Sequence, residues 1–285
     1  MVTFRTRFAP SPTGPLHLGH AYSALYGHRL AKVKNGLWLL RIDDLDHSRS
    51  KPEWTQKIFD DLHWLGLAWP EPVRFQSQET DTYQTALDAL ARAGLIYPCC
   101  CNRADIAQAA AAPQEGMPEF GPDGRIYPGT CRHRCLSQAG PGDALRLDMR
   151  KAVKALQKPV TYEEFGEQHS KRITLKAEAL IAQVGDVVLR RKDQGAAYHL
   201  AVVIDDDAQN ITDVVRGADL NAATQIHVVL QQLLNIPTPR YHHHSLIRDE
   251  TGKRLAKRSD SEALSSLRKA GHSAQDITER LFSAP

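Results

Sequence analysis

The chain has 285 residues, of which 42% are hydrophobic and 24% are charged, and its formal net charge is +3. These values are ordinary for a folded globular protein and exclude extensive disorder or a fibre. Its longest apolar runs are far shorter than the roughly 20 residues of a membrane span, and residues 1–10 lack the features of a secretory signal. We therefore expect a cytoplasmic, monomeric protein with no membrane partner, and the small positive charge permits an RNA partner without requiring one.

The first hundred residues predict strands alternating with helices, as in a parallel α/β sheet. Gly94 is a suitable stop for the last of these helices. In chain order, the pattern predicts a strand at 2–8, a helix at 19–34, a strand at 36–42 and helices at 53–65 and 80–93.

The rest of the chain is less regular. Residues 109–129 are rich in Ala, Pro and Gly and predict a surface insertion, which splits a group of five cysteines. We expect short strands and loops over 145–192. Apolar, β-branched runs then predict strands at 197–204 and 210–215, and a helix is expected at 221–234.

A His-Leu-Gly-His tetrad, residues 17–20, follows a Pro- and Gly-rich turn where the first predicted strand meets the first predicted helix. His17 and His20 can reach phosphate oxygens there, because a helix N-terminus favours anions. Gly19 lacks a Cβ, so an adenine or ribose can lie against the backbone. The two histidines could instead cap the helix, but their position behind the turn favours an ATP-binding site.

The segment 7–20 (RFAPSPTGPLHLGH) resembles the signature of class I aminoacyl-tRNA synthetases of the glutamyl/glutaminyl group. Residues 41–46 (RIDDLD) and 202–220 resemble two further motifs of that family, and the resemblance extends from about residue 5 to residue 257. It implies an α/β fold: a Rossmann-like catalytic core with an inserted zinc-binding, acceptor-type subdomain.

This resemblance divides the chain into four expected parts. Only 28 residues of the 285 follow Lys257, fewer than an independent domain needs, so we expect no anticodon-binding domain. A catalytic core of this length resembles the glutamyl-Q tRNA(Asp) synthetases within the family. The parts are the first half of the catalytic domain (1–98), the inserted subdomain (99–192), the second half with a KMSKS-like loop (193–260) and a C-terminal tail (261–285).

In the family, two arginines hold the side-chain carboxylate of glutamate, and the resemblance assigns this role to Arg7 and Arg216. A guanidinium group makes two charge-assisted bonds to a carboxylate and discriminates against an uncharged amide. The resemblance assigns Asp43 and Tyr198 to the amino group. The family usually has Glu in place of Asp43, which is one methylene shorter here and could alternatively cap the next helix. The remaining glutamate-binding residues implied are Phe8, Ala9, Pro10 and Ser11.

Residues 254–258 (RLAKR) occupy the place of the family's KMSKS loop. The resemblance assigns to Lys257 the neutralisation of charge on the leaving pyrophosphate, so that Lys257 joins His17 and His20 as catalytic residues. The ATP-binding set implied is His17, Gly19, His20 and Lys257. Arg254 and Ala256 depart from the family pattern, and a basic pentamer also fits a solvated loop.

The five cysteines lie between positions 99 and 135, and their odd number fits a reducing compartment and a metal site better than disulfides. Cys99, Cys101 and Cys131 offer thiolates in short clusters, as tetrahedral zinc requires. Cys100 should point away from its two neighbours if the segment is extended.

The resemblance implies one structural Zn²⁺ with Tyr127 as the fourth ligand. Cys135 and His133 are alternative fourth ligands, and buried thiols without a metal remain a further alternative.

Two polar runs remain. Histidines 242–244 are adjacent in sequence and point in different directions, so we expect His243 to form a pocket wall rather than the three to bind one ion. Asp205, Asp206 and Asp207 predict either a magnesium site or an acidic turn at a strand end that holds backbone amides or ribose hydroxyls.

The resemblance implies that ATP, with Mg²⁺, converts L-glutamate to glutamyl-adenylate without tRNA. Glutamate then passes to the queuosine base in the anticodon of tRNA(Asp). Two alternatives remain: a ligase that activates another small acid, and a catalytically impaired paralogue that acts as an RNA-binding or regulatory protein.

Overall fold

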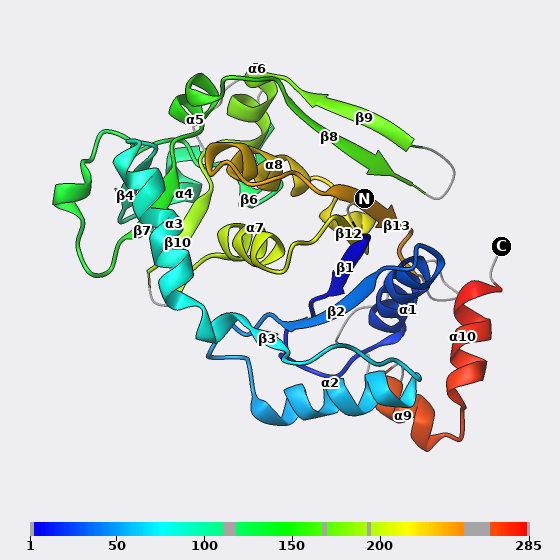
Figure 1. The fold of residues 1–285 in the computed structure, drawn as a ribbon. Coiled ribbons are helices and arrows are strands. Elements are labelled where there is room, and N and C mark those ends of the chain that lie inside the picture. The colour runs from blue at the N-terminus through cyan, green and yellow to red at the C-terminus, as the bar shows by residue number, and fades with distance from the viewer. Residues whose placement is uncertain (1–2, 111–117, 167–169, 193–194, 248–262, 284–285) are drawn as a thin grey trace.

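The structure is a computed structural model that describes residues 3–110, 118–166, 170–192, 195–247 and 263–283 (Figure 1). The strands are β1 (Arg5–Phe8), β2 (Leu37–Ile42), β3 (Arg74–Phe75), β4 (Ile96–Cys99), β5 (Phe120–Gly121), β6 (Gly124–Arg125), β7 (Ala144–Leu147), β8 (Val160–Phe165), β9 (Ser170–Leu175), β10 (Val188–Arg191), β11 (Gly195–Ala196), β12 (Asp213–Gly217) and β13 (Arg240–His244). The α-helices are α1 (Leu18–Val33), α2 (Pro52–Trp64), α3 (Thr80–Arg92), α4 (Arg103–Ala110), α5 (Met149–Ala155), α6 (Ala177–Ala179), α7 (Tyr198–Ala208), α8 (Thr224–Leu233), α9 (Leu264–Lys269) and α10 (Ala274–Phe282). Short helical turns are η1 (Gln76–Gln78), η2 (Leu136–Gln138), η3 (Leu180–Val184) and η4 (Ala218–Leu220).

A parallel arrangement of strands forms the centre of the molecule. β1 pairs with β2, and β2 with β3, all in parallel. On its other side β1 meets the residue that precedes β12, since the Thr212 N–H donates to the Arg5 carbonyl at 2.9 Å. β12, β13 and β8 continue in parallel, and β9 closes the edge in the antiparallel sense. The carboxyl ends of β1, β2 and β12 therefore meet, and ligands of open α/β sheets bind outside such ends.

A second, antiparallel sheet is built from the middle of the chain, in the order β11, β10, β7, β4. It packs against α3 and α7, and its residues share one hydrophobic core with α8. A separate core joins α1 and the first strands to α9 and α10, and α10 lies beside α1 in Figure 1.

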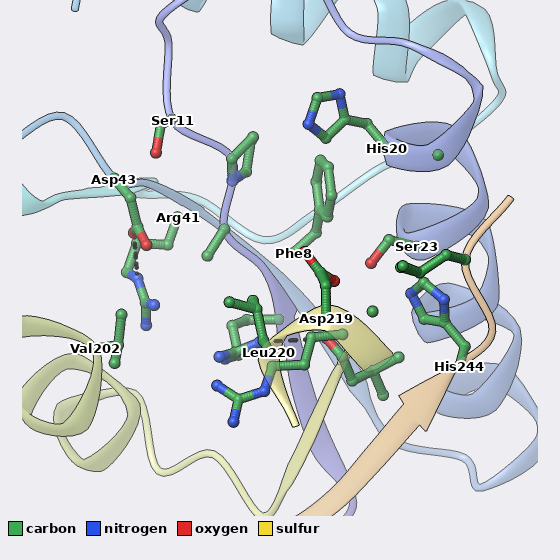
Figure 2. A pocket seen from close by; sticks show the side chains of 18 of the residues that line it. Phe8, Ser11, His20, Ser23, Arg41, Asp43, Val202, Asp219, Leu220 and His244 are labelled. Carbon is green, nitrogen blue, oxygen red and sulfur yellow. Dashed lines mark hydrogen bonds and ion pairs between the residues drawn. The ribbon is translucent and has the colours of Figure 1, made fainter. Parts of the chain in front are cut away.

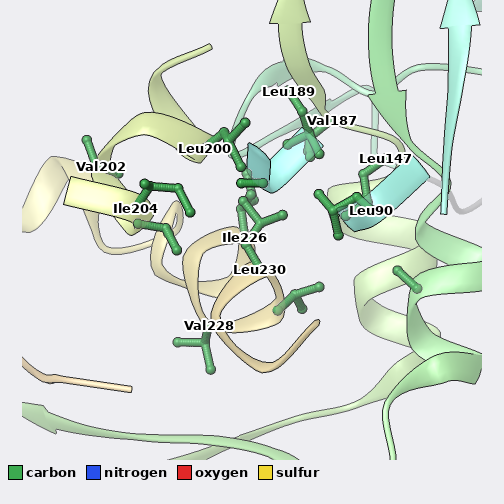
Figure 3. Close-up of a cluster of buried hydrophobic side chains, with 14 of the residues drawn as sticks. Leu90, Leu147, Val187, Leu189, Leu200, Val202, Ile204, Ile226, Val228 and Leu230 are labelled. Atoms are coloured by element: carbon green, nitrogen blue, oxygen red, sulfur yellow. The ribbon is translucent and has the colours of Figure 1, made fainter. Parts of the chain in front are cut away.

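The predicted strand at 197–204 is wrong, because these residues begin helix α7. Residues 199–206 of this helix are all buried, and it packs against α8 in the core drawn in Figure 3. A helix that is apolar on most of its circumference shows no helical period in its sequence, so its apolar run looks the same as that of a buried strand.

The other predicted elements are largely confirmed. The helices at 19–34, 53–65, 80–93 and 221–234 appear as α1, α2, α3 and α8, and Gly94 adopts the positive φ of 69° that ends α3. The last predicted strand, β12, starts three residues later than expected, because Asn210 turns the chain with φ 51° after α7. The region 145–192, expected to hold strands and loops, also contains α5, whose N-cap Asp148 accepts the Lys151 N–H.

No helix among the described residues is long and apolar enough to cross a membrane.

Candidate active site

A cavity of about 550 Å³ lies at the carboxyl ends of β1, β2 and β12 (Figure 2). The N-termini of α1 and α7 also reach it, through His17 and Tyr198 respectively. The structure thus brings together eleven of the residues predicted for glutamate and ATP. These are Arg7, Phe8, Ala9, Pro10, Ser11, His17, Gly19, His20, Asp43, Tyr198 and Arg216.

Lys257 lies outside the described residues, as do Arg254 and Ala256. The described residues on either side of that segment contact the cavity or its wall. Ile247 lines it, and Ala263 forms a β-bridge with His17.

The two histidines of the tetrad cap α1 as well as line the cavity. His17 Nδ1 accepts the Gly19 N–H at 3.1 Å, and His20 Nδ1 accepts the His17 N–H at 3.2 Å. Because each Nδ1 is an acceptor, each neutral ring carries its proton on Nε2. The rings stack with centroids 3.8 Å apart. The capping role that the sequence offered as an alternative therefore fixes two N–H donors at the cavity wall.

Gly19 is packed closely by the His17 ring of the same chain. A Cβ at this position would lie 3.0 Å from Cε1 of the His17 ring. The predicted contact of Gly19 with adenine or ribose stays a prediction.

One wall of the cavity is a network of buried ion pairs. Arg41 is fully buried and donates through Nε to Asp43 at 2.7 Å and through Nη1 to Asp206 at 2.7 Å. Arg7 donates to both carboxylate oxygens of Asp206, at 2.8 and 3.2 Å. Burial alone raises the pKa of Asp206, but Arg7 and Arg41 hold it below its usual value. Arg7 also donates through Nη1 to the Val215 carbonyl at 3.5 Å, so three of its N–H groups are already engaged by the protein.

Asp43 follows β2 directly and faces the same cavity (Figure 2). Burial raises its pKa to about 6, although the Arg41 guanidinium opposes the shift. The alternative of a helix cap is wrong, because the N-cap of α2 is Lys51. Asp43 is thus a buried carboxylate held in place by Arg41.

The acidic run at 205–207 does not form the predicted turn at a strand end, because these residues lie on helix α7. Asp205 accepts from Arg74 Nε at 2.8 Å and from Tyr83 OH at 3.0 Å, and Asp206 accepts from two arginines. Asp207 is exposed. The carboxylates of Asp205 and Asp206 thus bind side chains of the protein rather than backbone amides.

The opposite wall holds Arg216, which is 5% exposed at the end of β12. It donates through Nη2 to Thr224 Oγ1 at 2.7 Å, through Nη1 to His227 Nδ1 at 3.1 Å and through Nε to His243 Nε2 at 3.3 Å. Within the described ranges, no carboxylate oxygen forms a salt bridge with this guanidinium.

The histidines beside Arg216 do not add positive charge. Burial, together with the charge of Arg216, lowers the pKa of His243 to about 3 and brings the pKa of His227 well below its usual value. Arg216 is therefore a buried cation whose partners are neutral. A buried charge without a counter-ion is costly, and an anion that enters the cavity relieves this cost.

His243 does not form the predicted pocket wall. The cavity is lined by His244, and His243 lies opposite Arg216 in the β12/β13 register, where the two side chains meet. His242 contacts Asp213 at 2.8 Å. His244 Nδ1 contacts the Ser245 carbonyl at 3.0 Å, so the three histidines make separate contacts.

The sequence did not single out several residues that the structure places at the cavity. Arg41 is one of them; it pairs with Asp206, 165 positions away, and no local signal links the two. The sequence could have suggested Arg41, which opens the RIDDLD motif. The other missed lining residues are Ser23, Val202, Val215, Gly217, Asp219, Leu220, His244, Leu246 and Ile247.

The predicted metal ligands form a second cluster, away from the cavity. The sulfurs of Cys99, Cys101 and Cys131 all lie within 4.8 Å of one another. The Tyr127 hydroxyl lies 3.4 Å from Cys99 Sγ and from Cys101 Sγ. Tetrahedral zinc with bonds of about 2.3 Å requires sulfurs about 3.8 Å apart. The donor set and its spacing therefore fit zinc.

The alternative fourth ligands do not join this group. His133 and Cys135 are exposed and lie outside it. Cys100 is also exposed and outside the group, although its sulfur is 3.8 Å from Cys131 Sγ.

Comparison with known proteins places the chain in a family. The model of the "tRNA synthetases class I (E and Q), catalytic domain" matches residues 3–282. A glutamyl-Q tRNA(Asp) synthetase from Rhodobacter capsulatus is 52% identical over 275 residues, which cover 95% of this chain and 97% of the relative. One from Geobacter sulfurreducens is 42% identical, with 92% of this chain and 78% of the relative covered. The chain belongs to the glutamyl-Q tRNA(Asp) synthetases. It is accordingly a ligase with a class I synthetase catalytic domain, as the sequence predicted.

Solved structures agree with this family. A glutamate tRNA ligase from Elizabethkingia meningosepticum, crystallised with its amino acid, superposes with a TM-score of 0.69 at 25% identity and covers 95% of this chain. The chain spans 53% of the length of that ligase. A methionyl-tRNA synthetase from Mycobacterium tuberculosis shares the fold, with a TM-score of 0.59 at 10% identity.

Proposed function

We propose that the chain activates L-glutamate with ATP in the absence of tRNA and transfers it to the queuosine base in the anticodon of tRNA(Asp). The observation that carries this proposal is the buried Arg216 cation, whose partners in the described part of the chain are neutral, at the wall of a cavity that also holds the paired histidines. The names of the relatives support the same reaction.

The side-chain carboxylate of glutamate binds Arg216 in this proposal, and Arg7 assists through the N–H groups that Asp206 and the Val215 carbonyl leave available. The amino group lies between Asp43 and the Tyr198 hydroxyl. Arg41 donates to the Asp43 carboxylate at 2.7 Å and holds it in one orientation. This fixed orientation offsets the shorter reach of Asp compared with the Glu usual in the family. The segment from Phe8 to Ser11 completes the site, and these contacts leave the α-carboxylate free to react.

The triphosphate of ATP binds at the N-terminus of α1, where the Nε2–H groups of His17 and His20 are directed by the caps described above. Mg²⁺ enters as part of the ATP substrate. An α-carboxylate oxygen attacks the α-phosphorus, the bond from that phosphorus to the bridging oxygen breaks, and pyrophosphate leaves. The two histidines stabilise charge on the reacting phosphoryl group, and Lys257 stabilises the departing pyrophosphate.

In the second step a hydroxyl of the modified base attacks the carbonyl carbon of glutamyl-adenylate. An ester bond forms, AMP leaves, and the hydroxyl proton is released to solvent. No covalent intermediate with the protein is required.

Zinc has a structural role in the proposal, with Cys99, Cys101, Cys131 and Tyr127 as its ligands. The bound metal would link the end of β4 to the segment that carries Tyr127 and Cys131. It takes no part in the chemistry.

The test is transfer of radiolabelled glutamate to total tRNA from cells with and without queuosine. The proposal predicts label on tRNA only when queuosine is present. Equal labelling of both tRNA pools would contradict it, and so would the absence of ATP–pyrophosphate exchange with glutamate.

A further inference from the structure

Arg216 is connected to the inserted segment by a row of three polar side chains. His227 Nδ1 lies 3.1 Å from Arg216 Nη1, and His227 Nε2 lies 3.1 Å from His199 Nδ1. His199 Nε2 in turn lies 3.2 Å from Oδ1 of Asp123. Asp123 occupies the turn between β5 and β6, far along the chain from the helices that carry the two histidines.

Only one arrangement of protons satisfies every contact in this row. The Arg216 guanidinium can only donate, so His227 Nδ1 accepts and its proton is on Nε2. That proton is donated to His199 Nδ1, which places the His199 proton on Nε2, where it is donated to the Asp123 carboxylate. Both histidines are then neutral, and each contact joins one donor to one acceptor.

Because the two histidines are buried, the order of donors and acceptors in this row affects its stability. His199 is 6% exposed and His227 is 2% exposed, so water cannot easily replace a lost partner. Asp123 is the most exposed member of the row, and its second carboxylate oxygen accepts the Val188 N–H of β10 at 3.5 Å. The carboxylate therefore fixes the row at its outer end.

The row also touches the proposed site for the glutamate amino group. The Tyr198 ring makes edge contacts with both histidines, at centroid distances of 5.3 Å to His199 and 5.8 Å to His227. A rotation of either imidazole would disturb Tyr198 and Arg216 together.

We infer that Asp123 is a positioning residue for glutamate, acting through His199 and His227 to orient Arg216 and Tyr198. The inserted segment thereby takes part in amino-acid recognition without touching the amino acid. The inference rests on the proposed function, because it takes Arg216 as the group that binds the substrate carboxylate. Neutral histidines are consistent with the lowered pKa of His227, whose cause is burial and then the charge of Arg216.

The test compares Asp123→Ala with Asp123→Asn in ATP–pyrophosphate exchange at varied glutamate. The loss of one buried hydrogen bond corresponds to about threefold to tenfold in affinity, so Asp123→Ala should raise KM for glutamate by about that factor. KM for ATP should stay unchanged. Asp123→Asn retains an acceptor oxygen and should restore most of the wild-type KM.

Glu119→Ala is the matched control. Glu119 forms an ion pair with Arg125 on the same hairpin, and its side chain makes no contact with His199 among the described residues. This variant should leave KM for glutamate unchanged. An equal rise in Glu119→Ala and Asp123→Ala would overturn the inference, because it would show a general effect of the hairpin. An unchanged KM in Asp123→Ala would also overturn it.

A second measurement does not depend on activity. ¹⁵N NMR of the imidazole rings, assigned with His199→Gln and His227→Gln, should show protons on Nε2 of both histidines in the wild type. A proton on Nδ1 of either ring would contradict the inference. If the wild type fails to exchange with glutamate, the proposed function fails, and the NMR result still decides whether the row is ordered as described.

Discussion

The two walls of the cavity both bury arginines, but they treat the charge differently. On one wall, Arg7 and Arg41 are paired with Asp43 and Asp206 inside the protein. On the other, Arg216 contacts a threonine and two neutral histidines. Burial alone does not distinguish the walls. The partners distinguish them: carboxylates neutralise the arginines of the first wall, whereas Arg216 on the second wall has neutral partners among the described residues.

The cysteine cluster extends this comparison. Its three sulfurs and the Tyr127 hydroxyl gather in one place and contact one another. Where Arg216 offers N–H groups suited to an anion, this cluster offers lone pairs suited to a metal cation.

The largest effect expected from this contrast follows from Arg41→Met. The substitution keeps much of the volume but leaves Asp43, Asp205 and Asp206 buried without Arg41. Breaking a buried ion-pair network from one side costs about 3–5 kcal/mol. We expect the free energy of unfolding, measured with denaturant, to fall by about that amount. A loss below about 1 kcal/mol would remove the distinction between the walls.

Arg216→Met is the matched substitution on the opposite wall. Because Arg216 has no carboxylate partner in the described structure, stability should change by less than about 1 kcal/mol or should rise. Glutamate-dependent ATP–pyrophosphate exchange should fall by about a hundredfold or more, since each hydrogen bond between charged groups contributes about 1.5–3 kcal/mol. A destabilisation as large as that of Arg41→Met would contradict the comparison.

Cys131→Ser tests the second set of donors. It should lower bound zinc below the one ion per chain that elemental analysis should find in the wild type. We also expect Tm to fall by about 4–8 °C, which corresponds to a loss of about 2 kcal/mol of metal-linked folding free energy for a chain of this size. Cys135→Ser changes an exposed thiol outside the cluster and should alter neither quantity. Unchanged zinc content in Cys131→Ser would reject this ligand set.

The smallest effect concerns pH. The pKa of Asp43 is about 6, raised by burial, so the carboxylate loses its charge as the pH falls through this value. KM for glutamate should rise by up to about tenfold between pH 7.5 and pH 5. Asp43→Asn should abolish this dependence, and a dependence of equal size in Asp43→Asn would assign it to another group.

The effect of the same group on stability has the opposite sign. The folded chain holds the Asp43 proton more tightly than the unfolded chain does, so protonation favours folding at low pH. This contribution is lost as the pH rises through about 6. Protonation of Asp43 therefore stabilises the folded chain in acid, so the expected loss of glutamate affinity cannot be attributed to unfolding caused by this group.

Sequence reasoning succeeded where one short segment carries both structure and chemistry. The turn from Arg7 to His20 forms a strand end, a loop and a helix cap, so its residues must meet around one cavity. The same holds for Cys99 and Cys101, which lie together at the end of β4. The structure brings both groups together as predicted.

Sequence reasoning failed where a residue's conformation or contacts depend on residues far away in the chain. The apolar run in α7 has no visible period because α8 and the antiparallel sheet cover it. The acidic residues that follow it were misplaced with it. Nothing near Asp206 in the sequence identifies Arg7 and Arg41 as its partners, since these pairs span 199 and 165 positions. His243 and His244 were interchanged because strand register decides which of them faces the cavity.

The most direct test of the central claim is ATP–pyrophosphate exchange with L-glutamate and L-glutamine, in the wild type and in Arg216→Met. The account predicts exchange with glutamate and almost none with glutamine in the wild type, because an amide cannot neutralise Arg216. Arg216→Met should lose most of this preference together with most of the activity. Efficient exchange with glutamine in the wild type, or an unchanged preference for glutamate in Arg216→Met, would contradict it.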